Sequence, residues 1–325
     1  MRKIHFIILF SAFIFQSVFG QSFRKYAGEF LTLGAGSRAL GMAGAFTAVA
    51  NDVTAGYWNP AGLVNADGLQ IQFMHSKQFI SSIQYNYLAA SGSMDENTTV
   101  GISFFYLTVN NIKDSRDAWN EAEQKVDPSK VTSFNTGDYS LLLSYAHRLK
   151  PQLSYGVNVK ILYRDYKVDE ALGLGFDAGL RYAPLKGLYL GLMVNDITST
   201  LIAWNDYENE LIKPSARLGV TYKFFIPSVN LRIQPAVDIK FYGENRRFSS
   251  QVNVGWLSGD FFSGIELAYN EIIALRVGLD DLNRFNTGIG VQIPRIRFDY
   301  SFTSYQSELG DIHRISFHLK FDGIL

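Results

Sequence analysis

The sequence contains no cysteine and comparatively little charge. None of its 325 residues is Cys, and only 18% are Asp, Glu, Lys or Arg, below the roughly 25% of soluble domains. Without cysteine the chain has no disulfide, no thiolate metal site and no catalytic thiolate. With 30 basic and 30 acidic residues it lacks the basic excess of nucleic-acid-binding proteins, so no nucleic-acid partner is expected. At 47% hydrophobic residues, the chain is too apolar for disorder.

The first twenty residues have the pattern of a secretory signal peptide. Arg2 and Lys3 precede an apolar run at positions 4–15, and Gly20 ends a small-residue cleavage pattern. This order predicts that residues 1–20 direct export and are then removed. An uncleaved membrane anchor is the alternative, but the apolar run is short for a helix that spans a bilayer with about 20 residues.

From residue 67 onward, apolar and polar residues alternate. The odd positions from Leu231 to Phe241 are apolar, whereas Arg232, Asp238 and Lys240 lie between them. A period of two is typical of a β-strand. The same alternation recurs in five other stretches, at positions 153–164, 172–182, 217–224, 296–303 and 314–321. The chain after the first 66 residues is therefore predicted to be all-β.

Two architectures fit many exported strands. A soluble sandwich or propeller would bury the apolar face, whereas a membrane barrel turns it toward lipid and encloses the polar face. The alternating stretches exceed the five or six residues of most soluble strands and are long enough to cross a bilayer. Short connections that contain proline alternate with longer polar ones, as in membrane barrels; these prolines are Pro151, Pro184, Pro227 and Pro294. We therefore predict an antiparallel transmembrane β-barrel at residues 67–325.

The connections also predict the number of strands. An even number is expected when both ends of a barrel lie on the same side of the membrane. Placing all the proline turns on that side gives fourteen strands. This count requires positions 248–269 to form one long strand, with a β-bulge at positions 257–260 where the apolar face changes.

Residues 21–66 break the alternation and are rich in glycine and alanine. Gly34, Gly36 and Ala39 match the dinucleotide fingerprint, but the chain offers no parallel α/β unit to hold it. Because eight strands already give a lumen that side chains fill, a lumen of fourteen strands is either open or plugged. We expect residues 21–66 to fold inward as a hatch. Its Arg38, Asn51 and Asp52 would pair with lumen charges, for which the candidates are Lys160, Asp177, Arg181, Arg232 and Asp238.

Two stretches of this segment, at positions 36–52 and 57–63, resemble the N-terminal signature of the PorV/PorQ family. That family comprises outer-membrane proteins of the FadL superfamily. Positions 269–278 and 309–317 also resemble it, and the residue after Asn-Pro-Ala indicates a PorV-like paralogue rather than PorV itself. The resemblance implies a fourteen-stranded barrel with an N-terminal hatch. The hatch motif comprises Gly36, Arg38, Gly41, Gly44, Asn51, Asp52, Asn59, Pro60, Ala61 and Gly62.

No set of residues indicates catalysis. The five histidines lack the spacing of a metal site, and no Gly-x-Ser-x-Gly element is present. We therefore expect no enzyme activity, no metal and no cofactor.

The resemblance implies an accessory barrel of the type IX secretion system in the outer membrane of a Bacteroidetes-type bacterium. Such a protein would bind the translocon, the attachment machinery or exported proteins with C-terminal signal domains. The candidate partner-binding loops lie at positions 111–135 and 198–211, because they combine aromatic with charged residues. Their candidate residues are Arg116, Asp117, Trp119, Trp204 and Tyr207. The alternative is that both tryptophans only anchor their loops or lie at the membrane interface.

The wider superfamily implies a second function, passive transport of hydrophobic small molecules across the outer membrane. Such transport requires an apolar pocket between the hatch and the barrel wall. The candidates are Phe30, Met42, Phe46, Tyr57 and Trp58. These residues could equally form the packing core of the hatch. Besides membrane lipid, the expected partners are thus proteins or a hydrophobic ligand.

Overall fold

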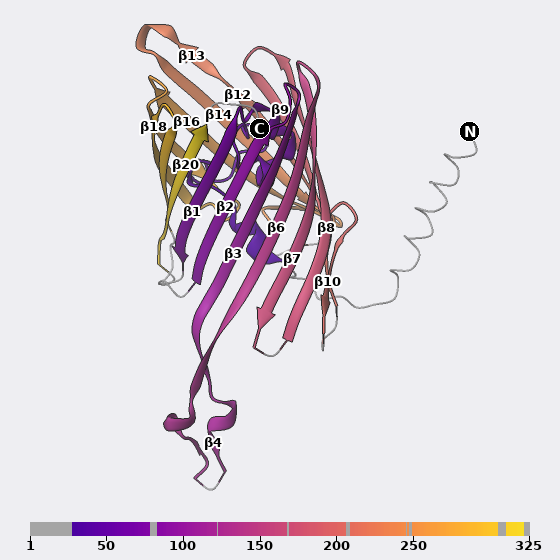
Figure 1. Ribbon diagram of the computed structural model, residues 1–325, viewed down its shortest axis with the longest axis vertical. Helices are drawn as coiled ribbons and strands as arrows, with labels where there is room; N and C mark the ends of the chain where they lie inside the picture. The colour runs from indigo at the N-terminus through magenta and orange to yellow at the C-terminus, as the bar shows by residue number, and fades with distance from the viewer. Residues whose placement is uncertain are drawn as a thin grey trace, which may run out of the picture.

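The computed structural model describes residues 28–78, 83–121, 123–167, 169–205, 209–244, 246, 249–304 and 310–321. The predicted signal peptide lies outside these residues and stays a prediction. The described chain forms a tall β-barrel with a long projection at one end (Figure 1).

The wall is a single closed antiparallel sheet. Six positions are single strands in chain order: β1 (Leu69–Gln78), β2 (Ile83–Ser93), β3 (Thr98–Asp114), β6 (Thr132–Lys150), β7 (Leu153–Tyr166) and β8 (Asp169–Leu185). The seventh is shared by β9 (Leu188–Asn195) and β10 (Thr200–Trp204), and the eighth by β11 (Glu210–Ile212), β12 (Ser215–Tyr222) and β13 (Phe224–Ile226). The remaining six are β14 (Leu231–Tyr242), β16 (Leu257–Tyr269), β17 (Ile273–Leu279), β18 (Phe285–Ile293), β19 (Ile296–Thr303) and β20 (Ile312–Phe321).

Because β20 pairs with β1, the sheet closes on itself. The predicted fourteen-stranded antiparallel barrel is thus confirmed.

Apolar side chains cover the outside of the wall, and polar ones face the lumen. On β7, Val157 and Ile161 are 43% and 37% exposed, whereas Asn158 and Lys160 between them are 1% and 3% exposed. A barrel of this kind presents an apolar surface to lipid and a polar surface to its interior. The alternation in the sequence therefore predicted the outward face correctly. Among the described residues, no helix has the length and apolar content needed to cross a membrane.

The two ends of the barrel differ. The short connections that contain Pro151, Pro227 and Pro294 lie at one end, which we call the proline-turn end. At the opposite end, the long-loop end, β3 and β6 continue as a two-stranded ribbon through the pairs Ile112–Phe134 to Asp114–Thr132. This ribbon and its tip form the β3–β6 arm, residues 110–135, which projects far from the wall in Figure 1.

The tip of the arm contains η3 (Arg116–Ala118), β4 (Trp119–Asn120), β5 (Lys125–Val126) and η4 (Pro128–Lys130). Hydrogen bonds from Arg116 and Lys167 hold the pKa of Asp114 below its usual range, so this carboxylate stays ionised. Asp114 thereby ties the tip to the β7–β8 connection.

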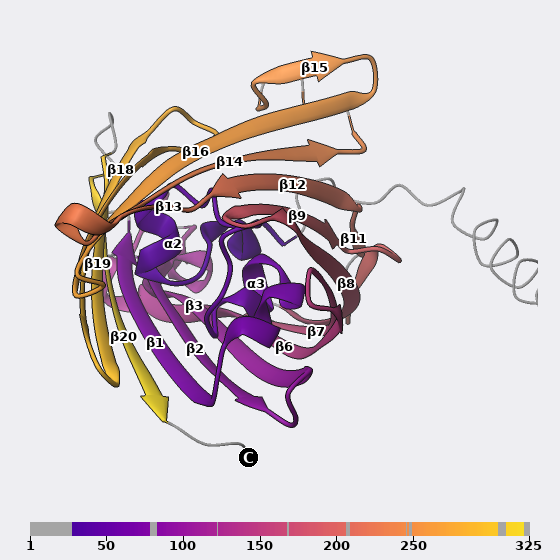
Figure 2. The ribbon, with the colours of Figure 1, turned by 90° about the horizontal axis from the view of Figure 1, so that it is seen from above.

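One detail of the predicted strand count is wrong. Positions 248–269 do not form one strand with a bulge, because β15 (Val252–Val254) folds back on β16 as a tight hairpin. Gly255 has a φ of 62° and allows this reversal. The change of apolar face therefore reflects a hairpin. Figure 2 shows β15 beyond β16, on the outer side of the wall, so it adds no strand to the barrel.

Residues 28–66, which we call the N-terminal segment, lie within the wall in Figure 2. They form η1 (Glu29–Leu33), α2 (Ser37–Gly41), α3 (Ala55–Trp58) and η2 (Pro60–Asn65), and most of them are buried. Glycines of the wall allow the close contact. A Cβ atom on Gly156 would lie 2.4 Å from the carbonyl carbon of Pro60, and one on Gly264 would lie 2.4 Å from the carbonyl oxygen of Met42. The role of this segment as a hatch stays a prediction.

Candidate functional site

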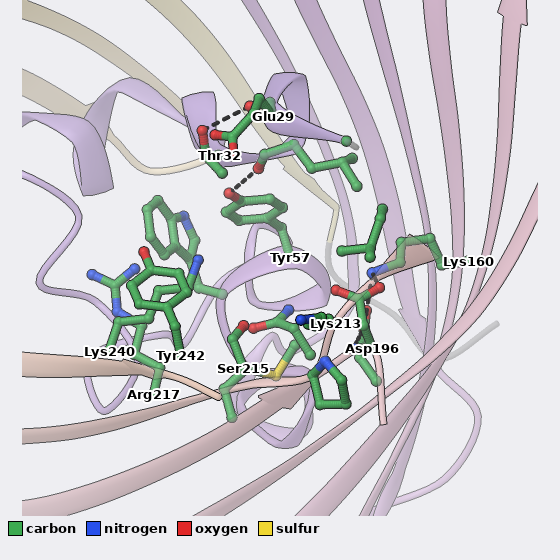
Figure 3. A pocket seen from close by; sticks show the side chains of 18 of the residues that line it. Glu29, Thr32, Tyr57, Lys160, Asp196, Lys213, Ser215, Arg217, Lys240 and Tyr242 are labelled. Atoms are coloured by element: carbon green, nitrogen blue, oxygen red, sulfur yellow. Dashed lines mark hydrogen bonds and ion pairs between the residues drawn. The ribbon is translucent and has the colours of Figure 1, made fainter. Parts of the chain in front are cut away.

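Cavities lie on both sides of the N-terminal segment. Two of them, of about 120 Å³ and about 400 Å³, lie toward the long-loop end and share lining residues such as Tyr57, Arg217, Lys240 and Tyr242. Figure 3 shows Tyr57 facing these three wall residues. A third cavity, of about 350 Å³, lies toward the proline-turn end, where Pro294 is among its lining residues. Residues of the N-terminal segment thus line cavities on both of its sides.

Six side chains, five of them buried and Arg297 largely buried, form a closed ring of alternating charge, which we call the charge ring. In order around the ring they are Arg38, Asp52, Arg297, Asp299, Arg276 and Glu266. Successive members lie 2.6 to 3.1 Å apart, measured between nitrogen and oxygen. Each charge has an opposite charge on both sides, which compensates the cost of its burial. Two members belong to the N-terminal segment and four to β16, β17 and β19, so the ring anchors the segment to the wall.

A second anchor is Asp238 on β14. Its Oδ2 accepts hydrogen bonds from the backbone N–H groups of Phe46 and Thr47, from the Thr47 hydroxyl and from Arg217 Nε. Hydrogen bonds to a carboxylate are stronger than those between neutral groups. Asp238 therefore fixes the middle of the N-terminal segment.

A third anchor is Asn59, whose side chain is completely buried. Its amide nitrogen donates hydrogen bonds to the carbonyl oxygens of Thr47 and Leu180, both at 3.0 Å. Its amide oxygen accepts a hydrogen bond from the N–H of Ala61 at the start of η2. Asn59 thus caps η2 and joins the segment to β8. These contacts are the structural role of the Asn-Pro-Ala-Gly element.

The ion pairs expected for the N-terminal segment are only partly correct. Arg38 and Asp52 do pair with wall charges, but their partners are Glu266 and Arg297, which were not among the candidates. Asp238 was a candidate, and it binds Thr47 instead. The other candidates, Lys160, Asp177, Arg181 and Arg232, make no ion pair with the segment. Alternation identifies which side chains face inward, but only the register of distant strands determines which charges meet.

The inner wall also carries an apolar patch, which the alternation did not predict. Its members are fully or almost fully buried: Tyr85, Tyr87, Phe105, Leu142, Leu162 and Ile202. They come from the four consecutive wall positions β2, β3, β6 and β7, and from β10, which lies beyond β8. A signal for them was present in runs where consecutive residues are all apolar, at positions 104–107, 141–143, 161–163 and 201–202. In such runs both faces of the strand are apolar.

The start of the N-terminal segment packs against the buried cluster that contains this apolar patch. Leu31 and Leu33 pack against the buried cluster, and the ring of Tyr57 lies 5.4 Å from that of Phe105. The Tyr57 hydroxyl donates a hydrogen bond to the carbonyl oxygen of Leu31, and the Tyr85 hydroxyl donates one to Gly34. Burial raises the pKa of Tyr57 to about 12, so the phenol stays protonated as this donor. The patch thus lies between the wall and the start of the segment.

The candidate apolar pocket is divided by the structure. Tyr57 and Trp58 line both cavities on the long-loop side. Met42 and Phe46 are 0% exposed, and Phe30 is also buried in the hydrophobic cluster. Those three residues therefore pack the interior, whereas Tyr57 and Trp58 line the cavities, although Trp58 is also buried in the same cluster.

The candidate partner-binding residues do not form one surface. Trp119 on the arm is 50% exposed and lies opposite Val126 in the β4–β5 pair, close in sequence to Arg116 and Asp117. Trp204 instead packs against Tyr166, with ring centres 5.4 Å apart, and against Arg164 on the wall. Tyr207 lies outside the described residues. Only the arm therefore presents an exposed tryptophan in the predicted loops.

Within the described ranges, no group of three His, Asp or Glu side chains could hold a metal ion.

One family model matches part of the sequence. The sequence model of the uncharacterised protein family UPF0164 matches residues 16–175. No curated protein sequence matches the chain.

Solved structures resemble the chain in fold. The toluene transporter TodX of P. putida has 14% identity and a TM-score of 0.60, over 89% of this chain and 99% of that one. The monoaromatic hydrocarbon channel CymD has 11% identity and a TM-score of 0.58, over 90% and 98%. A FadL homologue of Pseudomonas aeruginosa has 11% identity and a TM-score of 0.53, over 88% and 98%. The chain therefore shares the barrel fold of these transporters and channels.

Proposed function

We propose that this protein is a passive channel for hydrophobic small molecules in the outer membrane of a Gram-negative bacterium. The observation that carries the proposal is the apolar patch on the inner wall. A barrel that passes only water and ions has a polar interior. Here six large, mostly apolar side chains face inward and are buried, and one of them, Leu142, lines the cavity of about 120 Å³.

The arrangement of η1 supports this function. Its leucines pack against the buried cluster that contains the apolar patch, and Leu31 lines the cavity of about 120 Å³ together with Leu142 of the patch. A hydrophobic molecule that enters from this cavity and replaces Leu31 would exchange one apolar neighbour of the patch for another. The free-energy cost of opening is therefore small compared with exposure of the patch to water. The fold of the toluene and monoaromatic hydrocarbon channels is consistent with the same use.

Uptake of a labelled hydrocarbon tests the proposal. The full chain is expressed in a Gram-negative host that lacks hydrocarbon channels of its own, and uptake of radiolabelled toluene is measured. We expect faster uptake than in cells with the empty vector. As a control, the folded barrel is detected in the membranes by the change in its electrophoretic mobility on heating. Equal uptake rates in cells that contain the folded barrel and in cells with the empty vector would refute the channel function.

A second candidate function is protein binding by the β3–β6 arm. The observation that favours it is the half-exposed Trp119, which lies on a ribbon that extends beyond the wall. Exposed tryptophans with charged neighbours are common at the centres of protein interfaces. The specific role in type IX secretion rests on the resemblance of positions 36–52 and 57–63 to the PorV/PorQ family. Co-purification from the native membrane tests it, and a secretion translocon subunit is the expected partner.

A further inference from the structure

We propose that the β13–β14 hairpin at the proline-turn end binds an extended, acidic segment of a periplasmic protein as an added strand. The inference goes beyond the channel function and does not depend on it. It requires only that this end of the barrel face the periplasm, as the short turns of outer-membrane barrels do. Its basis is an unpaired strand edge with exposed aromatic side chains and cationic surroundings.

The first observation is the free edge of β13. Residues 224–226 pair with residues 231–233 of β14 on one side. On the other side the neighbouring strand, β9, begins only at Leu188, whose partner is Tyr222. Among the described residues, no strand pairs with this second edge of β13. Figure 1 shows the hairpin at the upper left, at the top of the barrel. Unpaired N–H and C=O groups on a strand edge can pair with a strand of another chain.

The side chains of β13 are exposed on both faces. Phe224 and Ile226 face outward and are 49% and 38% exposed, as expected next to lipid. Phe225 is 55% exposed, but it lies opposite Arg232, which pairs with Glu266 on the lumen side of the wall. Lipid surrounds the wall and contacts only its outward face, so lipid does not cover Phe225. A protein segment that lies along the edge does cover it.

The connections around the edge are basic. Three consecutive connections at the proline-turn end, at positions 147–154, 180–190 and 221–232, contain no Asp or Glu. Their cations are Arg148, Lys150, Arg181, Lys186, Lys223 and Arg232. Arg232 pairs with Glu266 and Glu271, whereas none of the other cations has a carboxylate at ion-pair distance among the described residues. These charges favour an acidic partner.

Two of these cations lie close together beside the edge. Arg181 and Lys223 both lie over the ring of Tyr189, at 4.3 Å and 5.6 Å from its centre. Lys223 directly precedes β13, and its backbone N–H donates a hydrogen bond to Gly187 in the connection that also carries Lys186. Like charges at such distances repel each other. A carboxylate of a bound segment would offset this repulsion.

A short peptide of alternating glutamate and valine, labelled with fluorescein, is the probe. Its binding to the full chain is measured by fluorescence polarisation in nonionic detergent. We expect binding, and slower hydrogen exchange at the amides of residues 224–226 in the complex. Two matched peptides replace every glutamate by lysine or the central valine by proline. Neither should bind, because the first has the wrong charge and the second cannot pair as a strand.

Variants of the chain test the assignment to this hairpin. Phe225→Ser should weaken binding about tenfold, as should the double variant with Lys186→Gln and Lys223→Gln. Phe225→Tyr should retain binding. The first control is Phe321→Ser, which alters an exposed phenylalanine of β20 at the same end. The second is Lys77→Gln, which alters an exposed cation of β1 toward the long-loop end. Both controls should bind the peptide like the wild type.

Each outcome decides the proposal. Absence of binding by a folded wild-type chain would refute it. Binding that survives both Phe225→Ser and the double lysine variant would refute the assignment to this hairpin, and binding without slower exchange at residues 224–226 would refute strand pairing. If the wild type binds phosphatidylglycerol added to the micelles but not the peptide, the basic connections recognise lipid and the proposal is wrong. Toluene uptake tests the channel function separately.

Discussion

Arg38 donates two hydrogen bonds to Glu266, from Nε at 2.9 Å and from Nη2 at 3.0 Å, although the two residues are 228 positions apart in the sequence. Glu266 also accepts hydrogen bonds from Arg276 and Arg232. The Glu266 carboxylate thus joins the N-terminal segment to the C-terminal part of the wall.

Removal of the Arg38 charge should destabilise the protein strongly. Arg38→Met leaves two buried carboxylates without one of their partners, which typically costs about 3–5 kcal/mol. The free energy of unfolding is measured by guanidinium titration in detergent micelles. Lys125→Met breaks the exposed Lys125–Glu123 pair and should change it by less than about 1 kcal/mol. Equal stability of the two variants would contradict the anchoring role of the charge ring.

A methyl group on Gly156 should displace the N-terminal segment. Its Cβ would lie 2.4 Å from the Pro60 carbonyl carbon and 2.5 Å from the Ala61 nitrogen, which are backbone atoms. We expect Gly156→Ala to cost about 1–3 kcal/mol and to speed proteolytic cleavage within residues 28–66. Gly259→Ala is the control, because the nearest atom to its Cβ would be 3.7 Å away. Cleavage at the same rate in both variants would contradict the prediction, because it would show that the backbone at Pro60 can move away from the added methyl group without displacing the segment.

Two neighbouring leucines on β6 point to opposite faces of the wall, one toward the lumen and the other toward the outside. Leu142 is 3% exposed and lines the cavity of about 120 Å³, whereas Leu143 is 43% exposed on the outside. Leu142→Trp should fill part of this cavity and reduce toluene uptake severalfold, at a packing cost of about 1–3 kcal/mol. Leu143→Trp should leave uptake unchanged, since an aromatic side chain is tolerated next to lipid. If both variants reduce uptake equally, the route does not pass Leu142.

Protein binding by the arm should depend on Trp119. Trp119→Ala is expected to abolish co-purification of a partner from the native membrane, because a central interface tryptophan contributes about 2 kcal/mol or more. Stability should change by no more than about 0.5 kcal/mol, since the side chain is half-exposed. Trp256→Ala, which alters the 70% exposed tryptophan next to β15, is the matched control. If the partner still co-purifies with the Trp119→Ala variant, the arm is not the binding site.

Much of the fold was readable from the sequence because its determinants are local. Alternation at Val157, Asn158 and Ile161 predicted the outward and inward faces of β7, and the position of the proline turns predicted the even strand count. The reversal at Gly255 was missed because a hairpin and a bulge both shift the apolar face by one residue. Distinguishing them requires the pairing of Val254 with Leu257, which alternation does not contain.

The site was less predictable because its contacts join distant strands. The sequence singled out Arg38 and Asp52, but their partners Glu266 and Arg297 follow from how β16 and β19 are aligned across the barrel. Alternation did not predict that Leu142 and Leu162 point inward, because a strict alternation assigns only one apolar face to each strand. Consecutive apolar residues were the signal that both faces are covered.

The charge ring has a consequence for the order of assembly. Its members lie at positions 38 and 52 and then between 266 and 299. Some of its pairs join residues close in sequence, but the two contacts that join the N-terminal segment to the wall, Arg38–Glu266 and Asp52–Arg297, cannot form until the last quarter of the chain has been placed. Contacts between such remote positions are slow to form. We therefore expect residues 28–66 to reach their final position in the lumen only after β16, β17 and β19 have formed, as a late step of folding.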